Sequence, residues 1–154
     1  MEELERLVAN TARAVDELNT PLGLFIENLV KPSLVRLFRE QGIEIYETTG
    51  RATSQRPGAE LGVDMLATTD ADVFVIEVKD HRSDQGVEDF LGKLRQFKQS
   101  FPRYANYQIY GAVAGIEIDE GVDRFAYQRG LFVIKQTGDT VMIANNSTFQ
   151  PTAW

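Results

Sequence analysis

Cysteine is absent from this 154-residue sequence, and histidine occurs once, at His81. A chain without cysteine has no disulfide, no zinc–thiolate site and no cysteine nucleophile. The single histidine also excludes a histidine-rich metal site, so a bound metal would need oxygen ligands, which favours magnesium, manganese or calcium. Because the lack of cysteine suits a reducing compartment, we expect a cytoplasmic protein.

Long apolar runs and an excess of positive charge are also missing. No apolar stretch approaches the length that crosses a membrane, so no membrane partner is expected. The first residues, MEELERLVAN, are acidic and are not typical of a signal peptide. The formal net charge is −7, whereas a general nucleic-acid-binding protein is usually basic. The charge therefore counts against strong non-specific DNA binding, although a local basic patch remains compatible with it.

What is present indicates one globular domain with an additional N-terminal helix. The chain is 43% hydrophobic and 25% charged, which is enough for a sizeable core. We therefore divide it into a helix, residues 1–19, and a domain, residues 20–154. The helix is either a packing element of the domain or the coiled-coil segment of a homodimer, which is the assembly we expect. This prediction comes from a heptad-like spacing of 4, 3, 4 and 3 among Leu4, Val8, Thr11, Val15 and Leu18.

The rest of the pattern predicts alternating helices and strands. Pro32 should kink or split a helix that starts near Thr20 and ends at Gly42. A strand, a helix and another strand imply a parallel pair, and the strands before them can form an antiparallel meander. This order predicts an α/β/α sandwich around a central mixed sheet. Strands are expected at residues 43–48, 61–68, 72–79 and 107–116 and twice within 131–145, helices at 85–100 and 119–130, and a polar loop at 49–59.

Charged residues interrupt two strands that should be buried. Asp64 lies within LGVDMLAT, and Glu77 and Lys79 lie within DVFVIEVK. If residue 69 pairs with residue 72 in the hairpin, the paired residue numbers sum to 141, and Asp64 lies opposite Glu77. Because side chains alternate along a strand, Glu77 and Lys79 share a face. Two carboxylates this close repel each other unless a proton or a cation lies between them, and a divalent metal with oxygen ligands would serve.

The spacing of Asp64 and the tripeptide Glu77-Val78-Lys79 resembles the D…(D/E)-X-K signature of the PD-(D/E)XK nuclease superfamily. The expected order of helix, three-strand meander, helix and strand is similar to the restriction-endonuclease-like core, over roughly residues 21–145. The chain also resembles members that carry a heptad-like helix in front of that core. It departs from the motif at Val63, which stands where the superfamily often has proline.

This resemblance implies a metal-dependent nuclease that hydrolyses phosphodiester bonds in DNA with Mg²⁺ or Mn²⁺. It implies that Asp64 and Glu77 ligate the metal, together with the main-chain carbonyl of Val78. Lys79 would position or activate the attacking water and balance the developing negative charge. Glu27, on the first core helix, would reach the metal through water.

Basic residues accumulate along the helix expected at residues 85–100 and just beyond it. They form either a solvated helix face or a patch that contacts phosphates beside the site. Some members of the superfamily carry a glutamine and a tyrosine four residues apart on this helix. Here Gln96 is present, but Ser100 stands in the place of the tyrosine, which leaves the role of Gln96 open. The candidate nucleic-acid-binding residues are Lys93, Arg95, Gln96, Lys98 and Arg103.

Three functions are compatible with the sequence. The first is a magnesium-dependent nuclease, which the intact set of Asp64, Glu77 and Lys79 favours. The second is a catalytically silent module with the same fold that binds nucleic acid or assembles proteins, which the net charge of −7 favours. The third is an unrelated α/β domain in which the three charges form a structural network.

Overall fold

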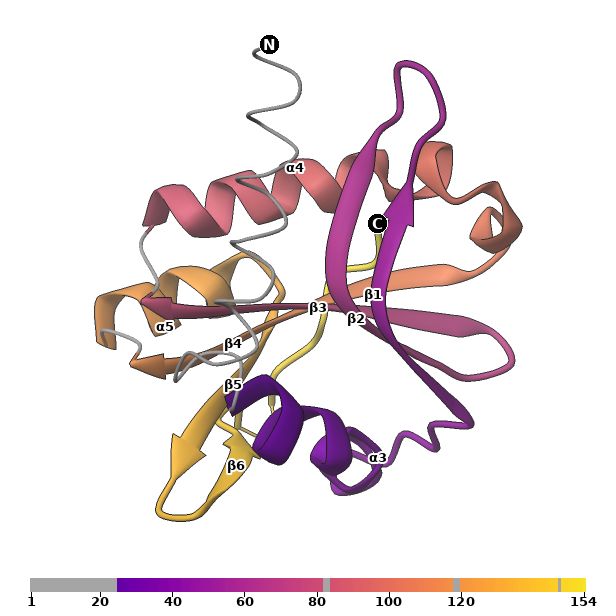
Figure 1. Ribbon diagram of the computed structural model, residues 1–154. Helices are drawn as coiled ribbons and strands as arrows, with labels where there is room; N and C mark the ends of the chain where they lie inside the picture. The colour runs from indigo at the N-terminus through magenta and orange to yellow at the C-terminus, as the bar shows by residue number, and fades with distance from the viewer. Residues whose placement is uncertain (1–24, 82–83, 118–119, 147) are drawn as a thin grey trace, which may run out of the picture.

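A mixed sheet forms the centre of the protein in a computed structural model that describes residues 25–81, 84–117, 120–146 and 148–154 (Figure 1). Within these ranges six strands lie side by side in chain order. Strands β1 to β3 form an antiparallel meander, β3, β4 and β5 are parallel, and β6 returns antiparallel to β5. The bounds are β1 Glu47–Ser54, β2 Leu61–Thr68, β3 Asp72–His81, β4 Gln108–Glu117, β5 Phe132–Thr137 and β6 Thr140–Ile143.

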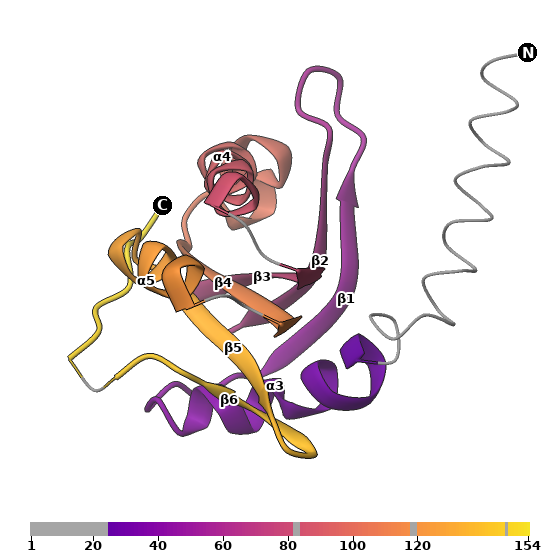
Figure 2. The same ribbon diagram turned by 90° about the vertical axis from the view of Figure 1, so that its left-hand side faces the viewer.

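Helices cover both faces of this sheet (Figure 2). The π-helix η1 (Ile26–Val30) and α3 (Lys31–Arg39) pack on one face, and α4 (Asp84–Ser100) and α5 (Glu120–Gln128) pack on the other. The predicted fold class, an α/β/α sandwich with a central mixed sheet, is confirmed. So is the order of helix, three-strand meander, helix and strand that the nuclease resemblance implies. The part of the chain that the structure describes holds no helix long and apolar enough to span a membrane. The helix expected at residues 1–19 lies outside the described residues.

The first described helix is split where proline predicts it. Pro32 stands in the first turn of α3, directly after the wider turns of η1. Proline lacks an N–H and its ring clashes with the carbonyl four residues earlier, so a regular α-helix cannot pass through it unchanged. Beyond α3, Gly42 adopts a φ of 80°, the left-handed conformation in which glycine commonly ends a helix.

The first strand is not where the sequence predicted it, and the expected strand at residues 43–48 is wrong. β1 covers Glu47–Ser54, so it shares only its first two residues with the expected strand and otherwise lies in the stretch expected to be a polar loop. As an edge strand that pairs only with β2, it leaves most of its side chains in solvent, so its composition resembles that of a loop. The apolar residues that suggested a strand instead pack beneath α3, where Ile45 is buried and Ile43 lies against the same core.

β2 changes direction at Asp64. Residues two apart in a strand normally share a face, yet Val63 packs on the α4 side of the sheet and Met65 on the α3 side. The register with β1 runs the length of β2, whereas the register with β3 runs only from Thr68↔Val73 to Met65↔Ile76. These pairs sum to 141, which confirms the predicted hairpin register. Past this point the β1–β2 hairpin leaves the sheet and extends beside α4 (Figures 1 and 2).

Candidate active site

Asp64 and Glu77 occupy the position where β2 leaves β3. An Oδ2 atom of Asp64 accepts a hydrogen bond of 2.7 Å from the backbone N–H of Val78. Since Thr69 is hydrogen-bonded to Asp72 and such pairs alternate along an antiparallel ladder, Val78 would ordinarily bond to the backbone of residue 63. The Asp64 carboxylate therefore takes the place of a ladder acceptor that the bend in β2 removes.

Glu77 is buried, with 5% of its surface exposed, and its charge is balanced from α4. The Lys93 ammonium lies 2.5 Å from Oε1 of Glu77 and also donates to the Gly62 carbonyl at 3.2 Å. An isolated buried carboxylate is costly, so this ion pair offsets part of the cost of burying Glu77. Lys93 reaches it from the flank of α4, because Phe90 and Leu94 anchor the adjoining face of the helix in the core.

The pKa of the Asp64 carboxyl is set by its burial and by the charged groups around it. Burial raises its pKa above the usual value of 3.8, and repulsion from Glu77 raises the pKa further. The Val78 N–H, the Arg51 guanidinium and the Lys93 ammonium oppose this shift by favouring the charged form. Two acids and two bases thus influence one another at this point of the sheet.

A small pocket opens beside Asp64. Its volume is about 170 Å³, roughly the share of five or six waters in the liquid. Gly62 contributes no side chain to this wall, and the space beyond its Cα is open. The pocket gives an ion or a phosphate group access to the Asp64 side of the carboxylate pair. It is lined by Arg51, Thr53, Gly62, Val63 and Asp64.

The remaining two residues of the expected site are placed by their backbones alone. Lys79 continues β3 two residues beyond Glu77, on the same face by strand alternation, and pairs with Gly115 of β4. Glu27 belongs to η1, which lies on the α3 side of the sheet. The side chains of Lys79 and Glu27 lie outside what the structure describes.

The residues of the predicted basic patch do not form one surface, because their side chains have different neighbours. Lys93 points to Glu77, as described above. Arg95 lies over the ring of Trp154, 5.5 Å from its centroid, and Arg103 lies over Tyr104 at 5.1 Å. Lys98 is half-buried.

Gln96 ties α4 to the start of β2. Its side-chain amide donates to the Glu60 carbonyl at 3.2 Å and to the Ser100 hydroxyl at 3.3 Å. The residue thus holds the projecting β1–β2 hairpin against α4, close to Lys93 and Gly62.

Two members of the charged cluster were not foreseen from the sequence. Arg51 was placed in a loop, because the polar composition of β1 hid the strand. Correct bounds for β1 would have revealed it, since the β1–β2 pairs sum to 115 and place Arg51 across from Asp64. Lys93 was assigned to a phosphate-contacting surface, because α4 alone does not show which of its polar residues turns back towards the sheet.

The donor groups suit a hard divalent cation. Asp64, Glu77 and the Val78 carbonyl offer oxygen donors, and Mg²⁺ commonly binds through one or two carboxylates while keeping several waters. Among the described side chains, no third acid or histidine joins the pair in a group that could hold a metal. A cation at this point would compete with Lys93 for Glu77 and with the Val78 N–H for Asp64.

No family model matches the sequence, and no curated protein matches it. Three solved structures are similar in part. A repair endonuclease from Pyrococcus abyssi is 20% identical, with a TM-score of 0.47 over 74% of this chain and 44% of its own. A protein of unknown function is 18% identical, with a TM-score of 0.43 over 66% and 54%. EndoMS in a complex with dsDNA is 16% identical, with a TM-score of 0.43 over 70% and 43%. This chain therefore spans only about half the length of these proteins, or less.

Proposed function

We propose that this protein is a metal-dependent nuclease of the PD-(D/E)XK type that hydrolyses phosphodiester bonds in DNA. The observation that carries the proposal is the meeting of Asp64 and Glu77 where β2 leaves β3, with Lys79 following on the same face of β3. The surrounding order of helix, antiparallel meander, helix and parallel strand is the core arrangement that this motif accompanies in the superfamily.

Each residue then has a defined task. Asp64, Glu77 and the Val78 carbonyl would hold Mg²⁺ or Mn²⁺, which when bound stabilises negative charge on the phosphate and lowers the pKa of water. Lys79 would orient the attacking water and offset the negative charge that develops during attack. Arg51, on the wall of the pocket beside Asp64, would draw the phosphate towards the carboxylates.

Nicking of supercoiled plasmid in Mn²⁺ tests this function. The wild-type protein should convert supercoiled DNA to the open circle, and EDTA should stop the reaction. Lys79→Ala should lower the rate by about 100-fold or more, the range seen when a group that handles protons in catalysis is lost. Asp64→Asn should also lower the rate strongly, because it removes a ligand of the metal that activates the water. Arg39→Ala, an exposed change on the outer side of α3, is the matched control. Equal rates for all variants would assign the nicking to a contaminant.

One observation favours a second function, a catalytically silent module of the same fold. Both carboxylates already have partners within the protein, Lys93 for Glu77 and the Val78 N–H for Asp64. A site of this kind is complete without a cation. Calorimetry with Mn²⁺ separates the two functions, because the nuclease requires binding that Asp64→Asn weakens. DNA binding without Mn²⁺ binding and without cleavage would support the silent module.

A further inference from the structure

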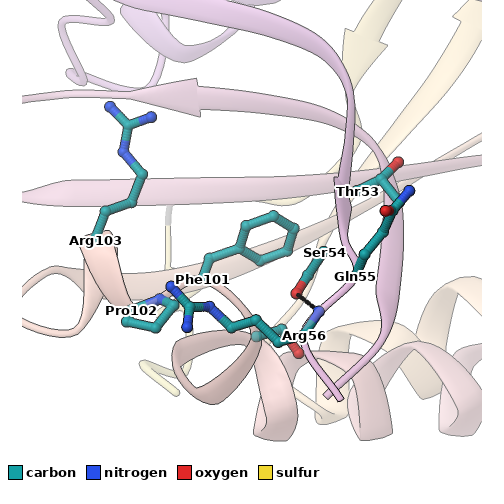
Figure 3. Close-up of a pocket in the computed structure, with 8 residues that line it drawn as sticks. Thr53, Ser54, Gln55, Arg56, Phe101, Pro102 and Arg103 are labelled. Atoms are coloured by element: carbon teal, nitrogen blue, oxygen red, sulfur yellow. Dashed lines mark hydrogen bonds between the residues drawn. The ribbon is translucent and has the colours of Figure 1, made fainter. Parts of the chain in front are cut away.

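A second, larger pocket lies between the end of the β1–β2 hairpin and the end of α4. Its volume is about 440 Å³ (Figure 3). The 3₁₀-helix η2 (Pro102–Tyr104), which follows α4, contributes part of one wall. The eight lining residues include two arginines and no acidic residue, although the chain carries a net charge of −7. They are Thr53, Ser54, Gln55 and Arg56 from the hairpin, and Ser100, Phe101, Pro102 and Arg103 from the helix end.

This pocket adjoins the one beside Asp64. Thr53 lines both of them, so the two spaces share a wall formed by β1. Arg51 lies in the first pocket, and Arg56 and Arg103 lie in the second. Arg51 and Arg56 thus follow the hairpin away from the carboxylates and Arg103 lines the second pocket from η2, and such a surface attracts a polyanion even when the whole molecule is acidic.

The second pocket also has an apolar side. Phe101 is half-buried and its ring packs against Phe97, with 4.9 Å between the ring centroids, so its position is fixed while part of the ring stays accessible. Figure 3 shows Arg56 extending from the hairpin towards Phe101 and Pro102, and Arg103 pointing away on the other side of the Phe101 ring. Both arginines are exposed. The Arg56 cation is directed at this aromatic surface, and a second cation, Arg103, lies next to it over the ring of Tyr104. Such a surface suits a planar base with phosphates along its strand.

We infer that this pocket binds one unpaired nucleotide of the DNA substrate, with the base on Phe101 and Pro102 and the adjoining phosphates at Arg56 and Arg103. One arginine can donate two parallel hydrogen bonds to the oxygens of one phosphate, and aromatic side chains stack on bases of any sequence. A volume of about 440 Å³ lies within the range of pockets that hold small molecules. A base that stays stacked inside a duplex cannot enter, and flipping it out costs a few kcal/mol, so the expected occupant is a nucleotide of a single-stranded segment. The inference rests on the proposed nuclease function for the direction of the strand, which would run from this pocket past Thr53 towards Asp64.

Fluorescence anisotropy in EDTA, where no cleavage occurs, tests the inference. The probes are a fluorescein-labelled single strand of about 15 nucleotides, a usual footprint for such proteins, and a blunt duplex made by annealing that strand to its complement. Arg56→Ala and Arg103→Ala should each weaken single-strand binding about tenfold, a loss of roughly 1.4 kcal/mol. Duplex binding should change less than about threefold, because the pocket does not take part in it. Arg39→Ala removes the same charge on the opposite face of the sheet and should leave both affinities within about twofold, as expected for a remote charge screened by salt.

Two results would overturn the inference. Equal losses for Arg39→Ala would mean that only net charge matters, and equal losses on the duplex would exclude an unpaired nucleotide. Phe101→Leu, which keeps an apolar wall but removes the ring, provides a second variant if an arginine change disturbs folding. It should also lower single-strand affinity, and an unchanged affinity would count against the pocket.

The pocket and the nuclease function can fail separately. If the wild type never nicks plasmid yet binds single strands through Arg56 and Arg103, the nuclease proposal fails and the pocket stands. If the wild type nicks plasmid but these variants bind single strands normally, the nuclease proposal stands and the pocket inference fails.

Discussion

At the scale of the residue, two ion pairs of the same type invite comparison. Lys93 pairs with Glu77 at the candidate site, and Lys135 pairs with Asp123 where α5 packs on β5. In both pairs 34% of the lysine side chain and 7% of the acid side chain are exposed. A second carboxylate, Asp64, influences the first pair, so the pair at Asp123 offers a comparison for the effect of a cation on a buried acid.

Lys93→Met should reveal whether Glu77 binds a divalent cation. Without the ammonium, a buried carboxylate loses its partner, and the free energy of unfolding should fall by up to about 3 kcal/mol. Manganese should restore much of this stability, because it can replace the ammonium beside Glu77. Thermal unfolding in EDTA and in Mn²⁺ measures both effects. Lys135→Met should be destabilised to a similar degree without recovery in Mn²⁺, and recovery of both variants or of neither would contradict a metal site at Glu77.

Asp64→Asn should stabilise the metal-free protein at neutral pH. Burial and Glu77 raise the pKa of Asp64, so the ionised group is less favourable in the folded chain than in the unfolded chain. Stability is therefore lost as the pH rises from the usual value of 3.8 through the raised pKa, and the loss is complete above it. The variant should have a higher Tm than the wild type at pH 7, and the difference should vanish below about pH 4, where Asp64 is protonated in both states.

Unfolding scans in EDTA at both pH values provide this measurement. Asp139→Asn, in the exposed turn between β5 and β6, is the control and should show no comparable gain. A lower Tm for Asp64→Asn at pH 7 would mean that the hydrogen bond to the Val78 N–H outweighs the repulsion from Glu77. With Mn²⁺ present the order should reverse, because the variant loses one of the two carboxylates.

At the scale of the element, α4 lies close against β4 because β4 has a glycine beneath it. A Cβ atom at Gly111 would lie 2.6 Å from Cδ1 of Leu94 and 2.8 Å from Cδ2 of Leu131. Both leucines are buried, so they have little space into which to move. This close contact helps to set the position of α4, and therefore of Lys93 above Glu77.

Gly111→Ala should destabilise the fold by about 1–3 kcal/mol through overpacking. The side chains that must move are Leu94 and Leu131, so the shift should also loosen Lys93 from Glu77. Gly92→Ala, on the open side of the same helix, meets no atom within 4 Å and should stabilise the protein by about 0.5–1 kcal/mol. Chemical denaturation of the two variants measures this difference in sign, and a stable Gly111→Ala would show that α4 has room to move.

The sequence predicted the central elements well and the edge of the sheet poorly. β2 has the predicted bounds, and the bounds of β3 and α4 differ from the prediction by one or two residues. These elements could be predicted because buried strands and helices have characteristic spacings of apolar residues. β1 is exposed at the edge, so its residues carry no such pattern. The bend at Asp64 was also hidden, since LGVDMLAT has the composition of a regular strand. Hairpin register alone therefore predicted the neighbours Asp64 and Glu77. Arg51 was missed because β1 was misplaced, and the role of Lys93 was missed because it depends on a contact between α4 and the sheet.

At the scale of the whole molecule, the assembly remains a prediction from residues 1–18, which lie outside the described part of the chain. Their heptad-like apolar spacing favours pairing with a second chain. Light scattering at tens of micromolar, a range suited to modest interfaces, should give the mass of a dimer for the full chain. Deletion of residues 1–18 should give the monomer mass. A monomeric full-length chain at that concentration would refute the dimer.

The order of the strands in the sheet is their order in the chain, and this has a consequence for how the protein is made. No strand has to insert between two others that are already paired. As the chain leaves the ribosome, each strand meets a neighbour that was synthesised just before it. The β1–β2–β3 meander, which holds Asp64 and Glu77, can therefore pair before α4 emerges with Lys93. Until then the two acids have no ammonium from α4, so a cation in the surroundings could assist the nascent hairpin before the helix arrives.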